Sequence, residues 1–211
     1  MTHDGIQLFH ITHINNLSSI LRHGGLWCDA ERLAQGWESV NIAHQSLKER
    51  RMRTQVPVSA GNMLGDYVPF YFCNRSPMLY AIHTGNVQGY NDGQAAVVYL
   101  VTSFGRVRQG NRAWCFTDGH AVEAVTGFYD SVTALNEIDW NLIQNWSWRN
   151  TEEDNDRKRR KQAEFLVKTS FPWSWVEKIG VKDTQHQDQV MALLGGQAHR
   201  PLVVLAPKWY Y

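Results

Sequence analysis

Short strand-like runs separated by turn residues are the feature of this sequence that most constrains its fold. Strand formers dominate residues 7–12, 66–72, 95–101, 113–117, 165–167, 176–181 and 201–205. Gly, Pro and Asn gather between several of these runs, as they do in turns. Because the runs outnumber the helical segments and do not alternate strictly with them, the sequence predicts an α+β fold rather than a doubly wound sheet.

Fewer stretches predict helices, and they do so mainly through residues typical of helix starts and ends. Ser76 followed by Pro77 is a capping hydroxyl with proline at the first helical position, which predicts a helix start. Asn15 or Asn16 predicts another helix start, and Gly24 indicates where that helix ends. Ile42, Ser46 and Glu49 suggest an exposed helix, residues 187–194 a further helix, and residues 128–148 show partial helical spacing of apolar residues.

The length of 211 residues and a hydrophobic content of 43% are enough for one full core, so we expect a single domain over residues 1–211. The formal net charge of +1 conceals two basic clusters, at residues 48–53 and 157–161. These clusters are compatible with a polyanionic partner, although a solvated face is the commoner reason for such runs.

Three scattered cysteines, Cys28, Cys73 and Cys115, are too few for a disulfide framework and lack metal-site spacing. We therefore expect a reducing, cytoplasmic setting and no metal. The first residues show no signal-peptide pattern, and no window reaches the ~18 apolar residues of a membrane span. We expect a soluble protein without a membrane partner, and nothing demands more than a monomer.

Glu164 lies where a charged run changes abruptly into the strand-like segment Phe165-Leu166-Val167. A carboxylate at the mouth of a strand can be held by the sheet and still face a cleft, where it can contact a sugar hydroxyl or stabilise developing positive charge. The commoner alternative is an exposed glutamate on an edge strand that faces water.

His10, Thr12 and His13 fall where the first strand runs into a helix start. Ring nitrogens, a hydroxyl and free backbone N–H groups together can hold ribose hydroxyls or a carboxamide. A structural histidine is the commoner alternative for either His alone. Zinc ligation by the pair is not expected, because no carboxylate or cysteine partner is indicated nearby.

The nine tryptophans provide a further signal, since five of them flank the second charged block. We expect most to be core or loop anchors, and one or two could stack on a nucleobase. The five are Trp140, Trp146, Trp148, Trp173 and Trp175.

A set of stretches that spans essentially the whole chain carries a resemblance to a known family. In order they are Phe9-His10-Ile11-Thr12-His13, Asn16-Leu17 with Gly25-Leu26-Trp27, Arg50-Arg51 with Val56-Pro57, the run from Asp66 to Phe72 with that from Arg75 to Tyr80, the run from Thr117 to Ala121, the run from Gln162 to Leu166, and Trp209-Tyr210-Tyr211. These stretches resemble the DarT toxins. The resemblance implies an ADP-ribosyltransferase fold similar to that of the poly(ADP-ribose) polymerases, with a mostly antiparallel split sheet and NAD+ in a cleft.

The resemblance also implies an activity and a partner. It implies transfer of ADP-ribose from NAD+ onto a base of single-stranded DNA, most often thymine, and a macrodomain antitoxin, DarG, that removes the modification. Other acceptors remain open, namely guanine in DNA, RNA ends or a protein side chain. A non-catalytic nucleic-acid-binding module also remains open, whereas an RNA 2'-phosphotransferase needs phosphate-binding Arg and His residues that the sequence lacks.

Residue by residue, Glu164 resembles the catalytic glutamate of the family and Arg51 its catalytic arginine. His120 lies in the stretch that resembles the substrate-facing loop and is expected to be catalytic too, since Glu164 itself or a relay through His120 could take the proton of the acceptor base. The residues expected to contact NAD+ are His10, Thr12, His13, Asn16, Leu17, Arg51, Tyr71, Met78 and Leu79. The residues expected to contact nucleic acid are His44, Lys48, Arg50 and Arg53.

Overall fold

A computed structural model describes residues 3–58 and 61–211 of the chain; Met1, Thr2, Ser59 and Ala60 lie outside the described residues. Within these ranges, none of the helices has both the length and the apolar character that crossing a membrane requires.

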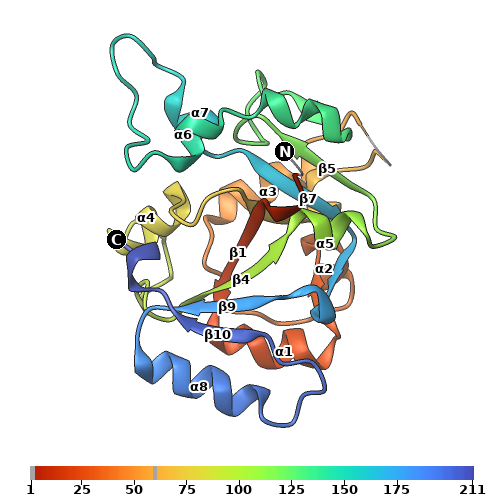
Figure 1. Ribbon diagram of the computed structural model, residues 1–211, viewed down its shortest axis with the longest axis vertical. Coiled ribbons are helices and arrows are strands. Elements are labelled where there is room, and N and C mark those ends of the chain that lie inside the picture. Colours follow the sequence, from red (N-terminus) through yellow and green to blue (C-terminus); the bar gives the residue numbers. More distant parts are fainter. Residues whose placement is uncertain (1–2, 59–60) are drawn as a thin grey trace.

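The fold is centred on a large sheet (Figure 1). Among the described residues it has eight strands in the order β10-β9-β4-β1-β3-β7-β5-β6. Every pairing is antiparallel except that of β9 with β10. The strands are β1 (Gln7–His13), β3 (Tyr67–Tyr71), β4 (Val97–Ser103), β5 (Trp114–Thr117), β6 (Phe128–Tyr129), β7 (Glu164–Lys168), β9 (Lys178–Val181) and β10 (Leu202–Leu205). The prediction of an α+β fold with a mostly antiparallel sheet is confirmed.

A second, two-stranded sheet joins β2 (Gly25–Trp27) to β8 (Ser170–Pro172). Gly25 is required there, because its φ is +148° and a Cβ at this position would lie 2.2 Å from the carbonyl oxygen of Phe171. This pairing holds β2 against the segment that follows β7, and residues of β2 line the pocket described below.

Short helices surround the large sheet. They are α1 (Leu17–Arg22), α2 (Asp29–Ala34), α3 (Gln45–Arg53), α4 (Pro77–His83), α5 (Phe104–Arg108), α6 (Trp140–Gln144), α7 (Arg157–Arg160) and α8 (Thr184–Leu194), with 3-10 turns at His3–Gly5, Ile14–Asn16, Leu64–Asp66, Val132–Glu137, Trp173–Trp175 and Pro207–Trp209. Helix α8 lies beside β10 at one end of the molecule, and α6 and α7 lie at the other end (Figure 1).

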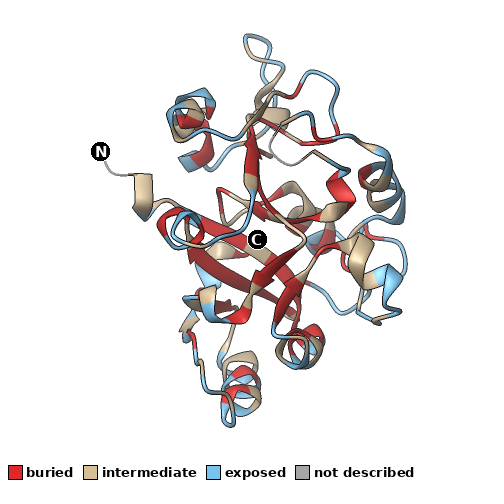
Figure 2. Ribbon diagram, turned by 90° about the vertical axis from the view of Figure 1, so that its right-hand side faces the viewer, coloured by how far each residue is buried: buried red, intermediate tan, exposed pale blue. Residues whose placement is uncertain are grey.

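Both faces of the central strands of the sheet are buried, as the colours of Figure 2 show. In β1 Leu8 packs into one apolar cluster while Phe9 packs into another, because successive side chains of a strand point to opposite faces. In β4, Val98 and Tyr99 divide in the same way. Burial on both sides explains why residues 95–101 read as a continuous apolar run rather than an alternating one.

Two local predictions hold in part. Helix α1 begins at Leu17 with Asn16 at the N-cap position, as predicted, but the Asn16 side chain makes no capping hydrogen bond; the ring of His13 instead accepts a hydrogen bond from Asn15 N. The partial helical spacing of residues 128–148 corresponds to the 3-10 turn Val132–Glu137 and helix α6 (Trp140–Gln144), not to one continuous helix. Ser131 and Asp139 each cap a separate element, and Ile138 between them is extended, so the apolar spacing is interrupted twice.

Candidate active site

Glu164 is the first residue of β7 and lies opposite Tyr71 of β3. Its side chain is buried, with only 2% of the residue exposed. One carboxylate oxygen, Oε2, lies 2.7 Å from Nη1 of Arg51, and the other, Oε1, accepts a hydrogen bond of 3.1 Å from the backbone N–H of Ala121. The alternative of an exposed edge-strand glutamate is therefore wrong.

Arg51 is the partner of this carboxylate and the one buried residue of α3 within the described chain. Burial opposes its charge, but the nearby Glu164 carboxylate more than compensates and raises the pKa of Arg51. Among the residues that the structure describes, Nη2 of Arg51 is buried and has no hydrogen-bond partner. A buried donor of this kind is costly to leave unpaired, so Nη2 is suited to an oxygen atom of a substrate.

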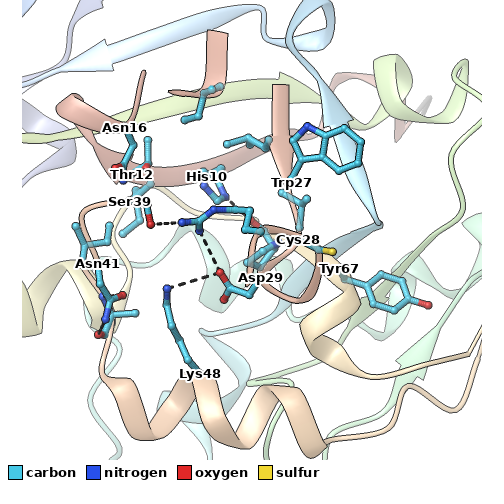
Figure 3. A pocket seen from close by; sticks show the side chains of 18 of the residues that line it. His10, Thr12, Asn16, Trp27, Cys28, Asp29, Ser39, Asn41, Lys48 and Tyr67 are labelled. Atoms are coloured by element: carbon cyan, nitrogen blue, oxygen red, sulfur yellow. Dashed lines mark hydrogen bonds and ion pairs between the residues drawn. The ribbon is translucent and has the colours of Figure 1, made fainter. Parts of the chain in front are cut away.

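A pocket opens beside the Arg51–Glu164 pair, between β1, β3, α2, α3 and residues 37–43. Figure 3 shows part of its lining, including His10, Thr12 and Lys48. Eight of the residues singled out from the sequence line it: His10, Thr12, Asn16, Lys48, Arg51, Tyr71, Met78 and Glu164. Residues that are distant in sequence thus meet at one cavity. Their individual contacts with a ligand stay predictions.

His10 combines a structural contact with a place in the pocket wall. Its Nδ1 lies 2.8 Å from the carbonyl oxygen of Pro69, and a carbonyl can only accept, so Nδ1 carries the proton. Burial lowers the pKa of His10 to about 4. The ring is therefore neutral near pH 7, and Nε2 is left as an acceptor that suits a ribose hydroxyl.

Tyr71 is held as a neutral phenol next to Glu164. Burial, reinforced by the negative charge of Glu164, raises the pKa of Tyr71 well above its ordinary value. An aromatic ring beside the carboxylate provides an apolar surface at this end of the pocket.

Three of the residues expected to contact NAD+ lie outside the pocket lining. Leu17 and Leu79 are fully buried in apolar clusters, so their side chains have no access to it. His13 is also buried: its Nε2 lies 3.1 Å from Oδ2 of Asp92, and its Nδ1 accepts from Asn15 N. The periodicity of helix and strand directs these three side chains into the core, so the pocket gives their expected contact with NAD+ no support.

A polar cluster that could not be predicted from the sequence lies at the mouth of the pocket (Figure 3). Asp29 lies between two cations, 3.2 Å from Nη1 of Arg32 and 3.6 Å from Nζ of Lys48. Arg32 also donates a hydrogen bond to Ser39. The cations outnumber the carboxylate in this cluster, and no motif marks it, because α2 and α3 become neighbours only in the folded chain.

Asn16 fixes the loop at this mouth. Its amide pairs with the backbone of Val40, accepting from Val40 N at 2.8 Å and donating to Val40 O at 3.0 Å, and it also donates to Thr12 Oγ1. Nearby, Trp37 stacks on His23 with ring centroids 3.8 Å apart. Residues 37–43 are therefore held over the cavity by side chains of the first fifty residues.

His120 lies near the pair but not in the pocket lining; its Nδ1 lies 3.6 Å from Oε1 of Glu123. The loop that carries it does touch Glu164, through Ala121 N. Arg159 holds this loop by donating to Asp118 Oδ1 at 3.0 Å. A catalytic role for His120 thus stays a prediction, whereas its neighbour Ala121 contacts Glu164 through its backbone N–H.

Of the four residues expected to contact nucleic acid, only Lys48 lines the pocket. His44 and Arg53 are exposed at the two ends of α3. Arg50 is exposed too and donates to Val122 O at 3.1 Å. Across the described residues, no group of three or more His, Cys, Asp or Glu side chains is placed to hold a metal ion.

Comparison with known proteins agrees with this geometry. The family model described as "ssDNA thymidine ADP-ribosyltransferase, DarT" matches residues 9–211. A DNA ADP-ribosyl transferase of Thermus aquaticus is 41% identical over 97% of this chain and 88% of its own length. One from Mycobacterium tuberculosis is 32% identical over 99% of this chain and 90% of its own length.

Solved structures match equally well. Thermus sp. 2.9 DarT in complex with ADP-ribosylated ssDNA superposes with a TM-score of 0.91 at 38% identity, covering 98% of this chain and 96% of that one. The same protein in complex with NAD+ gives a TM-score of 0.88 at 37% identity, covering 99% and 98%. This chain therefore belongs to the DarT family of ssDNA thymidine ADP-ribosyltransferases.

Proposed function

We propose that this protein transfers ADP-ribose from NAD+ to a thymine of single-stranded DNA, with Glu164 and Arg51 at the reacting end of the pocket. The observation that carries the proposal is the buried ion pair of 2.7 Å between them, in which Arg51 keeps an unpaired Nη2. Family membership and relatives solved with NAD+ and with ADP-ribosylated ssDNA support it.

In this proposal NAD+ lies along the pocket with its nicotinamide ribose near Glu164. The neutral Nε2 of His10 accepts from a ribose hydroxyl. Lys48 and Arg32, which lie 3.6 and 3.2 Å from Asp29 at the mouth, take the diphosphate. Charge-assisted hydrogen bonds to phosphate favour such cations, and this role replaces the DNA contact expected for Lys48.

Glu164 is suited to stabilise the positive charge that develops when NAD+ is cleaved. When the bond between nicotinamide and ribose breaks, its electron pair leaves with nicotinamide and positive charge develops at the ribose carbon. A fixed carboxylate stabilises that charge, and its position costs no reorganisation because Arg51 and Ala121 N already hold it.

Attachment of ADP-ribose to thymine needs a group that accepts a proton. The ring nitrogen of thymine that attacks the ribose carbon is protonated at neutral pH, and its proton passes to Glu164 as the new bond forms. Nη2 of Arg51 can then donate to an oxygen of the thymine or of the ribose. Single strands are the favoured substrate, since a base in a duplex must first be flipped out.

One experiment tests reaction and acceptor together. Labelled NAD+ is incubated with a mixed-base oligonucleotide, a thymine-free one and a hairpin duplex, and the products are analysed by mass spectrometry. We expect one ADP-ribose on a thymine of the single strand, and neither the thymine-free strand nor the paired stem labelled. Turnover on the thymine-free strand would indicate another acceptor, and no turnover on any strand would indicate a binding module.

The family also suggests a partner. We propose that a macrodomain antitoxin, DarG, removes the modification. Its support is family membership. Incubating labelled DNA with a purified macrodomain protein of this type should release the ADP-ribose; retention of the label would contradict the pairing.

A further inference from the structure

The loop between α6 and α7 carries two tryptophans with opposite environments. Trp148 is an anchor: its Nε1 donates to the hydroxyl of Tyr211 at 3.1 Å, and its ring meets that of Tyr80 edge-on at 5.5 Å. Trp146, two residues earlier, is 73% exposed. Large aromatic side chains are mostly buried in folded proteins, so the exposure of Trp146 calls for a reason.

One face of Trp146 is covered by a cation. The guanidinium carbon of Arg75 lies 3.9 Å from the centre of the indole ring. Arg75 is itself fixed, since Nη2 donates to the carbonyl oxygen of Tyr210 at 2.6 Å and the ring of Tyr211 lies 5.2 Å away. The indole ring therefore rests on a positioned guanidinium.

The loop that carries Trp146 is held by several hydrogen bonds. Arg157 donates to the carbonyl oxygens of Ser147 at 3.2 Å and Arg149 at 3.1 Å. Just before it, the buried Lys161 ammonium donates to the carbonyls of three residues, of which Asn145 lies at 2.8 Å. Trp146 is thus presented on a fixed segment, so little conformational entropy is lost when a ligand stacks on it.

The same segments lead directly to the reacting end of the pocket. Arg75 follows Tyr71 by four residues, so their Cα atoms are at most about 14 Å apart. Lys161 precedes Glu164 by three residues, and Tyr71 pairs with Glu164 across the sheet. Trp146 therefore lies within a few nucleotides of any base that is held at Glu164.

We propose that Trp146, supported by Arg75, is a stacking site for a base that flanks the modified one in single-stranded DNA. The inference rests on the proposed function and adds a site to it. Aromatic platforms bind bases of any sequence because every base has a π face, and cations nearby favour the phosphates. Two exposed residues supply that charge: Arg149 on the loop between α6 and α7, and Lys158 on α7.

The test is a coupled substitution of protein and DNA. Binding of a fluorescent oligonucleotide is measured by anisotropy without NAD+, using the wild type, Trp146→Ala and Trp146→Phe. In each oligonucleotide one nucleotide around the target thymine is replaced by an abasic spacer. We expect Trp146→Ala to raise the Kd by about 5- to 150-fold and Trp146→Phe by less, since the ring is retained.

The decisive readout is coupling at one position. For the wild type, an abasic spacer at the stacked nucleotide should raise the Kd, and this increase should vanish in Trp146→Ala. Leu202→Ala, at an exposed residue of β10, is the matched control that should retain the wild-type profile. Identical abasic profiles for the wild type and a folded Trp146→Ala would overturn the site, including the case in which Trp146 docks a protein partner instead.

Failure of the site and failure of the function give different results. Labelling of thymine by the wild type is followed in parallel by mass spectrometry. If the wild type labels thymine while Trp146 shows no coupling, only the stacking site is wrong. If the wild type labels nothing, the proposed function fails as well.

Discussion

At the reacting end of the pocket, Arg51 and Glu164 are 113 positions apart in the chain and meet at 2.7 Å, whereas at the mouth Asn16 and Val40 are only 24 positions apart. The pair is buried and held by the central sheet, so it can move only with the core. The mouth is held by the part-buried hydrogen bonds between Asn16 and Val40 and by packing of Ile42 into an apolar cluster. The two ends of the pocket thus differ in how they are held: a buried ion pair within the central sheet at one end, and contacts within the first fifty residues at the other.

Glu164→Gln should have the largest effect, because it removes the charge from the fixed end and leaves the shape. We expect labelling of DNA to fall by about 10² to 10³. The thermal midpoint should fall too, since Arg51 then lies buried without an opposite charge. Equal labelling by the variant and the wild type would remove Glu164 from the mechanism.

Acid should weaken the wall of the pocket through His10. Its pKa is about 4 in the folded protein and near 6.5 unfolded, so only the unfolded chain takes up the proton between these values. Stability should therefore be complete above pH 6.5 and fall towards pH 4, by at most about 3 kcal/mol. Urea titrations of the wild type and His10→Asn, which keeps a donor towards Pro69, should diverge in that window; parallel curves would contradict the low pKa.

Lys48→Met tests the mouth as a diphosphate site. Loss of one charge-assisted contact should raise KM for NAD+ by about tenfold, or about 1.4 kcal/mol, and have little effect on KM for the oligonucleotide. Arg53→Met, at an exposed residue of the same helix, is the control. The reverse pattern, with KM for the oligonucleotide raised, would return Lys48 to the DNA.

Asn16→Leu should have the smallest effect and sharpen the contrast between the two ends. It removes the hydrogen bonds to Val40, each contributing about 1 kcal/mol. We expect faster amide exchange in residues 37–43 and a severalfold rise in KM for NAD+. If exchange instead accelerates around Glu164, the two ends are not independent.

Much of the fold could be predicted because strands and the helix cap at Ser76 are local signals. The continuous apolar run around Val98 and the Ser–Pro start of α4 appear in the structure where the sequence predicts them. The partial helical spacing over 128–148 gives two short elements instead of one helix. The apolar spacing is real, but Ser131 and Asp139 compete for the backbone N–H groups and divide it.

Some residues of the candidate site could be predicted from the sequence, and others could not. The resemblance identified Glu164 and Arg51, but it also selected Leu17 and Leu79, which lie in the core. It missed Asp29 and Arg32, because nothing local distinguishes them from surface charge.

By itself, the sequence determined the strands, the fold class and the family, since these depend on residue type and spacing along the chain. Only the tertiary structure decided that Glu164 is buried against Arg51, that Lys48 faces a pocket and that Trp146 stands open beside Arg75. The physical reason is that burial and charge pairing depend on which segments become neighbours, and contacts between residues far apart in the chain leave no periodic pattern in it.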